Sequence, residues 1–379
     1  MIYKEFQDIE LSALGFGAMR LPTTAGDPNG SIDEKQTAEM VAYAIEHGIN
    51  YFDTAYGYHD GQSEVVMGKV LSQYPRESYY LADKFPGYDL SNMDKVEAIF
   101  EEQLAKCGVD YFDFYLLHNI YEKNVDPYMD EKYGIMDYLL AQKKAGRIRH
   151  LGFSAHGRYD TMEKFLKVYG KEMEFCQIQL NYLDWKLQDA KAKVELLDQY
   201  QIPVWVMEPL RGGALTKLSD ENAAKLAALR PEESVPAWAF RFLQSVGSVK
   251  MVLSGMSNLE QMKENVKSFE AEKPLTEQEM TALTEVADSM LDILPCTACR
   301  YCTAHCPQQL DIPVLLSLYN ETHFANGLIT HMAVDALPEE RRPNACIGCK
   351  SCEAVCPQQL AIADAMGDFV EKLNQPAGL

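Results

Sequence analysis

The chain lacks any apolar run that could cross a membrane. No stretch of eighteen residues is both apolar and free of charge, and the first ten residues, MIYKEFQDIE, contain acids instead of the apolar core of a signal peptide. Basic residues are scarce as well, since 35 Lys and Arg stand against 56 Asp and Glu and leave a formal charge of -21. This charge argues against nucleic acid or an anionic membrane as a partner. We expect a soluble, cytoplasmic protein.

Two further features are missing. No G-x-G-x-x-G motif follows any strand-like run, which weakens the alternative of a doubly wound open sheet that binds a dinucleotide. A disulfide framework is not expected either, because the ten cysteines of an unexported chain stay reduced inside a cell. With 379 residues, 47% of them hydrophobic, the chain is long enough for a large domain and a second unit without covalent cross-links.

What the chain does contain is a regular succession of short apolar runs, each bounded by Gly, Pro, Asn or Asp and followed by a helical pattern. Strand then helix, eight times over, predicts an α/β fold of the (β/α)8 TIM-barrel class. Ser31 and Glu34 predict a capping box for the first helix, which Gly48 would stop. The eight strands are expected near residues 14–18, 49–53, 79–83, 111–117, 148–153, 175–180, 203–207 and 249–254. The helices are expected near residues 31–47, 63–71, 93–107, 135–145, 159–169, 188–199, 236–246 and 258–266.

Polar side chains stand at three successive strand ends of this pattern. Asp53 and Tyr58 follow the second run, Lys84 ends the third and His118 ends the fourth, at the rim where a parallel barrel places its chemistry. A phenol has a pKa of about 10, so a Tyr that protonates an oxyanion needs a nearby cation. We expect Asp53 to hold Lys84, Lys84 to lower the pKa of Tyr58, and His118 to orient a carbonyl oxygen. The alternative is a structural Asp53–Lys84 ion pair beside unrelated polar residues.

These four residues resemble the catalytic tetrad of the aldo/keto reductases. The flanking sequences LGFGAMRLP at 14–22, GINYFDTA at 48–55 and GQSE at 61–64 are similar to that family's first strand signatures. The resemblance covers residues 1–272, the expected barrel domain. It implies a hairpin within residues 2–11 that closes the barrel, a nicotinamide cofactor, and a small carbonyl or alcohol substrate. The substrate loops 85–92, 119–134 and 211–221 do not name the substrate.

The same resemblance assigns residues of the later strands to the cofactor, which is NAD(H) or NADP(H). It places the nicotinamide amide on Ser154 and Gln177 and the ring against Met207, where the family often has Tyr. The pyrophosphate turn is expected at Pro209, Leu210 and Gly213. The adenosine segment is expected at Ser254, Gly255, Ser257, Gln261, Glu264 and Asn265. No Lys or Arg directly follows Gly255, which favours NADH over the 2′-phosphorylated form.

Eight of the ten cysteines lie in two runs with the same Cys and Pro spacing, CTACRYCTAHCP and CIGCKSCEAVCP. Each holds three thiols at two-residue spacing and a fourth before Pro, the pattern that binds 4Fe-4S clusters. Structural zinc is the alternative, but it uses simpler pairs of cysteines. The pattern resembles bacterial-type ferredoxins, which implies two clusters with crossed fourth ligands. One set is then Cys296, Cys299, Cys302 and Cys356, and the other Cys346, Cys349, Cys352 and Cys306. Cys107 and Cys176 are expected in the barrel core.

The second domain is expected to be small, mostly helical and ferredoxin-like. A connecting helix is expected near 277–291, within residues 273–294, and the cluster domain spans 295–379, with helices near 314–320, 328–334 and 362–373. The complete chain is predicted to be an oxidoreductase with Tyr58 as general acid and base, with a possible one-electron redox partner at the clusters. The alternatives are a reductase fed by low-potential electrons from the clusters, or a non-catalytic redox or nucleotide sensor.

Overall fold

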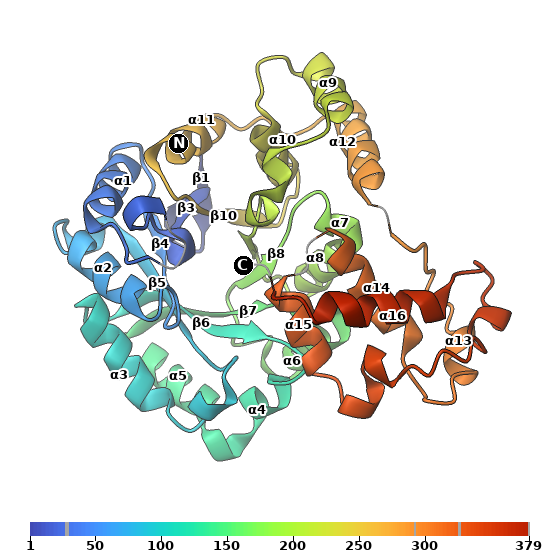
Figure 1. Cartoon of the computed structure of the whole chain (residues 1–379). Helices are drawn as coiled ribbons and strands as arrows, with labels where there is room; N and C mark the ends of the chain where they lie inside the picture. The colour runs from blue at the N-terminus through green and yellow to red at the C-terminus, as the bar shows by residue number, and fades with distance from the viewer. Residues whose placement is uncertain (27–29, 292, 325–326, 378–379) are drawn as a thin grey trace. The chain divides into compact units, whose positions relative to one another are not determined.

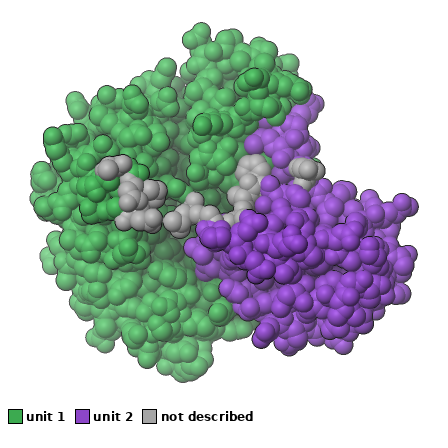
Figure 2. Space-filling model, viewed as in Figure 1, with its two compact units in different colours: residues 1–283 green, residues 284–379 purple. Residues whose placement is uncertain are grey.

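A computed structural model describes residues 1–26, 30–291, 293–324 and 327–377. The chain forms two compact units, Met1–Leu283 and Thr284–Leu379 (Figure 2). The division falls within helix α12, Glu277–Met290. The expected domain boundaries at residues 272 and 294 remain predictions.

The first unit contains a closed barrel of eight parallel strands (Figure 1), as the strand pattern predicted. Each strand pairs with the next along the chain, and β10 closes the ring against β3 and β9. This topology brings the carboxyl ends of all eight strands to one rim. The strands are β3 Leu14–Gly17, β4 Tyr51–Asp53, β5 Tyr80–Phe85, β6 Phe112–Ile120, β7 Ile148–Ala155, β8 Cys176–Gln179, β9 Val204–Met207 and β10 Val249–Gly255.

An antiparallel hairpin, β1 Tyr3–Phe6 and β2 Ile9–Ser12, precedes the barrel as expected. Phe6 and Leu11 of the hairpin pack into the cluster inside the barrel that also contains Phe114 and Trp205. The Phe6 ring meets Trp205 edge-on at 5.0 Å. Burial of these large aromatic side chains fills one end of the barrel and leaves the other end for polar residues.

Helices surround the strands (Figure 1). The expected capping box at Ser31 and Glu34 is wrong, because Asp33 caps α1 and its carboxylate accepts the Gln36 N–H at 2.9 Å. Ser31 instead bonds Thr24. The sequence pattern did not separate α4, α7 and α9. The helices are α1 Glu34–Glu46, α2 Gln62–Leu71, α3 Val96–Cys107, α4 Val125–Met129, α5 Ile135–Lys144, α6 Tyr159–Tyr169, α7 Asp184–Leu187, α8 Ala190–Gln199, α9 Asp220–Leu229, α10 Val235–Gln244 and α11 Leu259–Ser268.

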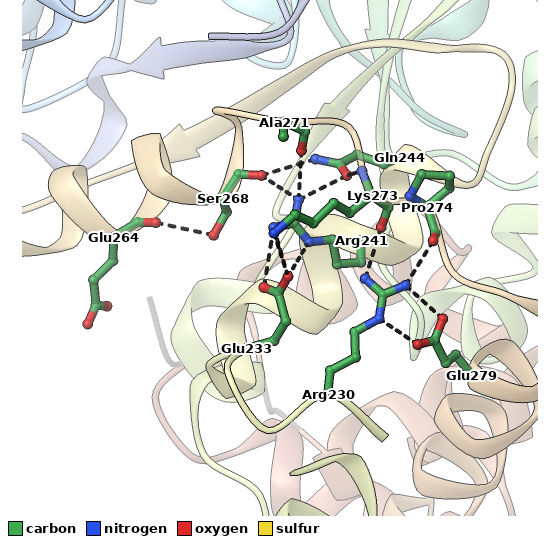
Figure 3. A network of polar contacts seen from close by, with 10 residues as sticks. All are labelled: Arg230, Glu233, Arg241, Gln244, Glu264, Ser268, Ala271, Lys273, Pro274 and Glu279. Carbon is green, nitrogen blue, oxygen red and sulfur yellow. Dashed lines mark hydrogen bonds and ion pairs between the residues drawn. The ribbon is translucent and has the colours of Figure 1, made fainter. Parts of the chain in front are cut away.

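Two arginines bind the segment that leads from α11 to α12 (Figure 3). Arg241 pairs with Glu233 and donates to the carbonyl of Ser268 at 2.6 Å. Arg230 forms two hydrogen bonds with Glu279, at 2.6 and 2.7 Å, and also donates to backbone carbonyls of the segment. A two-pronged Arg–carboxylate contact is among the stronger charged hydrogen bonds. The first turns of α12 are therefore attached to the barrel unit.

The second unit is mostly helical, as predicted. Its core contains Leu315, Leu316, Ile362 and Phe369, together with Cys302 and Cys352. Its helices are α13 Tyr301–Ala304, α14 Ile312–Phe324, α15 Leu328–Asp335 and α16 Ile362–Leu373. Across the described ranges of the chain, no helix combines the length and apolar character needed to cross a bilayer.

Candidate active site and cysteine sites

Asp53, Lys84 and Tyr58 come together at the carboxyl ends of β4 and β5. The Lys84 ammonium lies 2.6 Å from Asp53 Oδ1, 2.7 Å from the carbonyl oxygen of Thr54 and 3.3 Å from the Tyr58 hydroxyl. Lys84 is fully buried and Asp53 is 2% exposed. A buried ammonium with three oxygen partners is held in one position, and it faces the phenol whose proton it can influence.

Burial dominates the acid–base properties of this group. Burial opposes the charge on Lys84, but Asp53 and the Tyr58 hydroxyl outweigh it and raise the pKa of the ammonium. Burial also raises the pKa of Asp53, against the opposing effect of Lys84. Lys84 lowers the pKa of Tyr58, as expected, but burial raises it by more, so the pKa of the phenol lies above its ordinary value. The phenol is therefore protonated at neutral pH.

His118 stands beside Tyr58 at the end of β6. Its ring meets the Tyr58 ring edge-on at 6.0 Å and the Tyr88 ring edge-on at 5.1 Å. Burial and the nearby Lys84 charge hold the pKa of His118 well below its usual range, so the imidazole is neutral. Among the described residues its Nδ1 has no hydrogen-bond partner. A neutral imidazole can donate one hydrogen bond to a carbonyl oxygen.

A second group of buried polar side chains, around Asp83 and Glu64, adjoins Lys84 and was not predicted. Asp83 Oδ1 accepts the Lys84 N–H at 2.8 Å, and Cys107 Sγ lies 3.8 Å from Asp83 Oδ2. Glu64 accepts from Gln103 at 3.0 Å, and Gln103 also donates to the Lys84 carbonyl. Burial and the neighbouring Glu64 raise the pKa of Asp83 well above its ordinary value. Asp83 therefore keeps its proton far above the pH at which an exposed Asp loses it.

The residues expected at the nicotinamide amide lie on neighbouring strands. Ser154 and Gln177 are register partners in β7 and β8, and both are buried. The Ser154 hydroxyl accepts the Asn119 N–H at 2.7 Å. Gln177 Oε1 has no partner among the residues that the structure describes. A buried amide oxygen left this way is available to a donor such as a carboxamide.

The expected cofactor turn follows β9. Met207 is partly exposed, Pro209 is buried, Leu210 is partly exposed and Gly213 is exposed. Gly213 has φ 96°, which a residue with a side chain rarely adopts. The turn is thus built on a backbone that requires glycine at this position.

The expected adenosine segment joins β10 to α11. Asn265 donates to the Ser254 hydroxyl at 3.0 Å, and the Gln261 side chain accepts the Ser257 N–H at 2.8 Å. These contacts therefore support the segment itself, whereas Gly255 and Glu264 are exposed. The N-cap of α11 is Asn258, whose side chain accepts the Gln261 N–H.

Arg20 is a rim residue that the sequence reading missed, although it lies in the LGFGAMRLP signature. A side chain at Gly255 would meet the Arg20 stem at 3.3 Å, and one at Gly212 would meet its guanidinium at 3.4 Å. The Arg20 carbonyl accepts the Ser257 hydroxyl at 3.0 Å. Arg20 therefore spans the loops after β3, β9 and β10 and brings a cation to the expected pyrophosphate turn.

In the second unit the eight motif cysteines surround two cavities. One cavity, of about 350 Å³ including its mouth, is lined by four thiols and by Ile362. The other, of about 310 Å³, is lined by the remaining four thiols and also by Ile362. The first set is Cys306, Cys346, Cys349 and Cys352, and the second is Cys296, Cys299, Cys302 and Cys356. Each cavity takes three thiols from one motif and the fourth from the other.

This donor set fits an iron–sulfur cube. Four thiols around an enclosed space match the ligand number of a 4Fe-4S cluster. Within the described ranges, no three His, Cys, Asp or Glu side chains converge as they would around a single metal ion. Cys107 and Cys176 are buried in the barrel unit, as expected.

Comparison with known proteins agrees with both halves of this description. Residues 13–288 match the profile of the aldo/keto reductase family. The chain belongs to the aldo/keto reductase family. It is therefore an NAD(P)-dependent oxidoreductase, and residues 295–361 match a 4Fe-4S dicluster domain.

Curated relatives align with the reductase part of the chain. An NADH-specific methylglyoxal reductase of Escherichia coli is 26% identical over 328 residues, which cover 75% of this chain and 97% of that protein. An L-galactose dehydrogenase of Arabidopsis thaliana is 26% identical and covers 68% of this chain and 84% of that protein. An aldo-keto reductase of Bacillus halodurans in its holo form has a TM-score of 0.59 at 24% identity, covering 76% of this chain and 96% of that one. At this identity the structural match supports the fold.

Proposed function

We propose that the barrel reduces a small carbonyl compound to an alcohol, with Tyr58 as the general acid. The observation that supports this most strongly is the Tyr58 hydroxyl 3.3 Å from the buried Lys84–Asp53 ion pair. A bound nicotinamide supplies the hydride that reaches the carbonyl carbon. The Tyr58 proton passes to the carbonyl oxygen, so that one hydride and one proton give the alcohol.

Each neighbour of Tyr58 has a distinct part in this scheme. The Lys84 ammonium stabilises the phenolate that remains after proton transfer, and Asp53 keeps that ammonium charged and in place. The neutral His118 donates a hydrogen bond to the substrate oxygen and so orients the carbonyl beside Tyr58. Tyr88, edge-on to His118, forms one wall of the proposed substrate site.

We propose NADH as the preferred cofactor. Met256, Ser257 and Asn258 follow Gly255 without a cation, and the Lys263 ammonium lies over the Tyr43 ring at 5.7 Å. The Arg20 guanidinium approaches Gly212, on the pyrophosphate side, so it does not select for a 2′-phosphate. The E. coli relative, an NADH-specific methylglyoxal reductase, agrees with this choice.

We propose that the second unit holds two 4Fe-4S clusters with crossed fourth ligands, as in bacterial ferredoxins. The grouping of thiols around the two cavities supports the crossing, and Ile362 lines both. Clusters held by these thiols would supply single-electron transfer to a one-electron partner. A zinc site is disfavoured because each motif has a third Cys at the same two-residue step and a fourth before Pro, unlike the paired CxxC motifs of structural zinc.

We propose that hydride transfer in the barrel proceeds without turnover of the clusters. Nicotinamide delivers two electrons as hydride, whereas a 4Fe-4S cluster passes one at a time, and the sequence has no flavin fingerprint to link them. A reductase fed from the clusters is the second candidate, which the dicluster domain favours. A non-catalytic sensor has no need for the buried Tyr58–Lys84–Asp53 arrangement.

One anaerobic titration tests these proposals together. Protein with intact clusters is mixed separately with NADH, NADPH and a chemical reductant while its visible spectrum is followed. We expect NADH to bind and to drive carbonyl reduction while the clusters stay oxidised, and the chemical reductant to bleach them. Cluster bleaching by NADH at the turnover rate would overturn the separation of the two chemistries.

A further inference from the structure

The segment after β9 has an unusual backbone. Between residues 208 and 213, positive φ angles occur at Glu208 (53°), Arg211 (46°), Gly212 (63°) and Gly213 (96°). Glycine adopts this region freely, whereas Glu208 and Arg211 adopt it at a cost of roughly 1–3 kcal/mol each. The surrounding structure must therefore hold these two residues in place.

A buried carboxylate from the neighbouring loop provides one of the holding contacts. Asp184 is fully buried, and its Oδ1 forms an ion pair with the guanidinium of Arg211, which is 8% exposed. Its Oδ2 accepts hydrogen bonds from Gln179 at 2.8 Å and from Asn181 at 2.6 Å. The carboxylate is thus bonded on both oxygens, which a buried ion pair requires for stability.

Asn181 provides the second contact. Its side-chain amide also donates to the carbonyl of Glu208 at 3.1 Å, and its Oδ1 accepts the Asp184 N–H at 2.8 Å. The two strained residues with side chains, Glu208 and Arg211, are therefore the two that the loop after β8 holds.

We infer that Asp184 and Arg211 are positioning residues that hold segment 207–215 in the conformation that receives the pyrophosphate of the dinucleotide. The inference rests on the proposed cofactor. Neither residue needs to touch the substrate, because both act through the backbone of the turn at Pro209 and Gly213. Without the pair the segment relaxes, and binding must order it again, which weakens affinity.

The test compares Asp184→Asn, Arg211→Gln and the double variant with the wild-type protein. Calorimetry with NADH gives the Kd, steady-state kinetics give KM and kcat, and thermal unfolding gives Tm. We expect each single variant to bind NADH about tenfold more weakly, as loop ordering on this scale implies. Saturating NADH should restore kcat to near the wild-type value. Because the two residues act as one unit, the double variant should lose no more affinity than either single variant.

Arg241→Gln is the matched control. Arg241 also forms a largely buried ion pair, with Glu233, and it donates to the Ser268 carbonyl at the end of α11 (Figure 3). The next carbonyl, of Phe269, accepts the Ile2 N–H, so this end of α11 lies beside the start of the β1–β2 hairpin and away from the rim. This variant should lower Tm and leave the Kd for NADH unchanged. If the single variants do not fold, the double variant Asp184→Leu/Arg211→Met is used instead. It removes both charges together, and the same loss of affinity for NADH is expected.

The outcomes separate the two levels of the argument. A wild-type protein that binds neither NADH nor NADPH would overturn the proposed function, and this inference with it. Wild-type binding together with an unchanged Kd in every Asp184 and Arg211 variant would overturn this inference alone. A lower Tm without a change in Kd would show a purely structural pair, and would also overturn it.

Discussion

Replacing Tyr58 and replacing Lys84 should have different consequences, although both residues belong to one proposed mechanism. Tyr58→Phe removes a hydroxyl whose contact with Lys84 is 3.3 Å long, and it leaves the ring in place. The loss of one weak hydrogen bond changes the free energy of unfolding by no more than about 1 kcal/mol. Loss of the general acid should lower kcat by roughly 10²–10⁴-fold.

Lys84→Met removes activity and stability together. The substitution leaves the Asp53 carboxylate buried, 2% exposed, without its cation. Breaking a buried ion pair in this way costs roughly 3–5 kcal/mol. For a unit of this size that loss corresponds to a fall in Tm of roughly 10 °C.

The assay measures carbonyl-dependent oxidation of NADH, the Kd for NADH and the Tm of both variants under anaerobic conditions. Tyr58→Phe should retain the Tm and the Kd of the wild-type protein while losing turnover. Turnover of Tyr58→Phe within tenfold of the wild type would refute the role of Tyr58 as acid. An unchanged Tm in Lys84→Met would refute the assignment of a charged Lys84–Asp53 pair whose disruption destabilises the fold.

Three further predictions concern the metals and the buried acids. Anaerobic protein should contain about eight irons and eight sulfides. Cys356→Ala should damage the cluster of the first motif, which the electron paramagnetic resonance spectrum would show. Loss of the cluster on the second motif instead would contradict the crossed fourth ligands. Asp83→Asn should raise Tm at pH 8 and have little effect at pH 4. A carboxyl group whose folded pKa is raised stabilises the fold below its unfolded pKa and loses that contribution as pH rises through the folded pKa. An equal Tm of variant and wild type at pH 8 would contradict the raised pKa of Asp83 beside Glu64. Burial raises the pKa of Glu174, but hydrogen bonds from His150 and Lys143 outweigh burial and lower the pKa to about 2. Glu174→Gln should therefore destabilise the protein by about 2 kcal/mol above pH 5 and progressively less towards pH 2. Urea unfolding at several pH values measures this loss.

The architecture of both units could be predicted from local patterns. The eight strands appear in the sequence as apolar runs because both faces of a parallel strand in a barrel are buried. The expected strand boundaries agree closely with those in the structure. Each cysteine motif spans only twelve residues, so the cluster motifs could be identified without knowledge of the fold. Strand ends likewise located Asp53, Lys84 and His118, because parallel connectivity brings every carboxyl end to the same rim.

Other features depended on contacts that no local pattern contains. Asp184 and Arg211 are distant in sequence and meet only because β8 and β9 are neighbours in the barrel. The sequence suggested Ser31 as a helix cap, but Asp33 caps the helix and Ser31 is bonded to Thr24 instead. Short helices such as α7 are stabilised by their surroundings more than by their own propensity, so periodicity did not reveal them.

The chemistry of Tyr58 shows the same division most clearly. The sequence alone determined that a phenol, an ammonium, a carboxylate and an imidazole would share one rim. Only the tertiary structure decided the balance of charge there, because burial raises the pKa of Tyr58 more than Lys84 lowers it. The cost of removing an ionisable group from water depends on every atom packed around it, and that environment exists only in the folded chain.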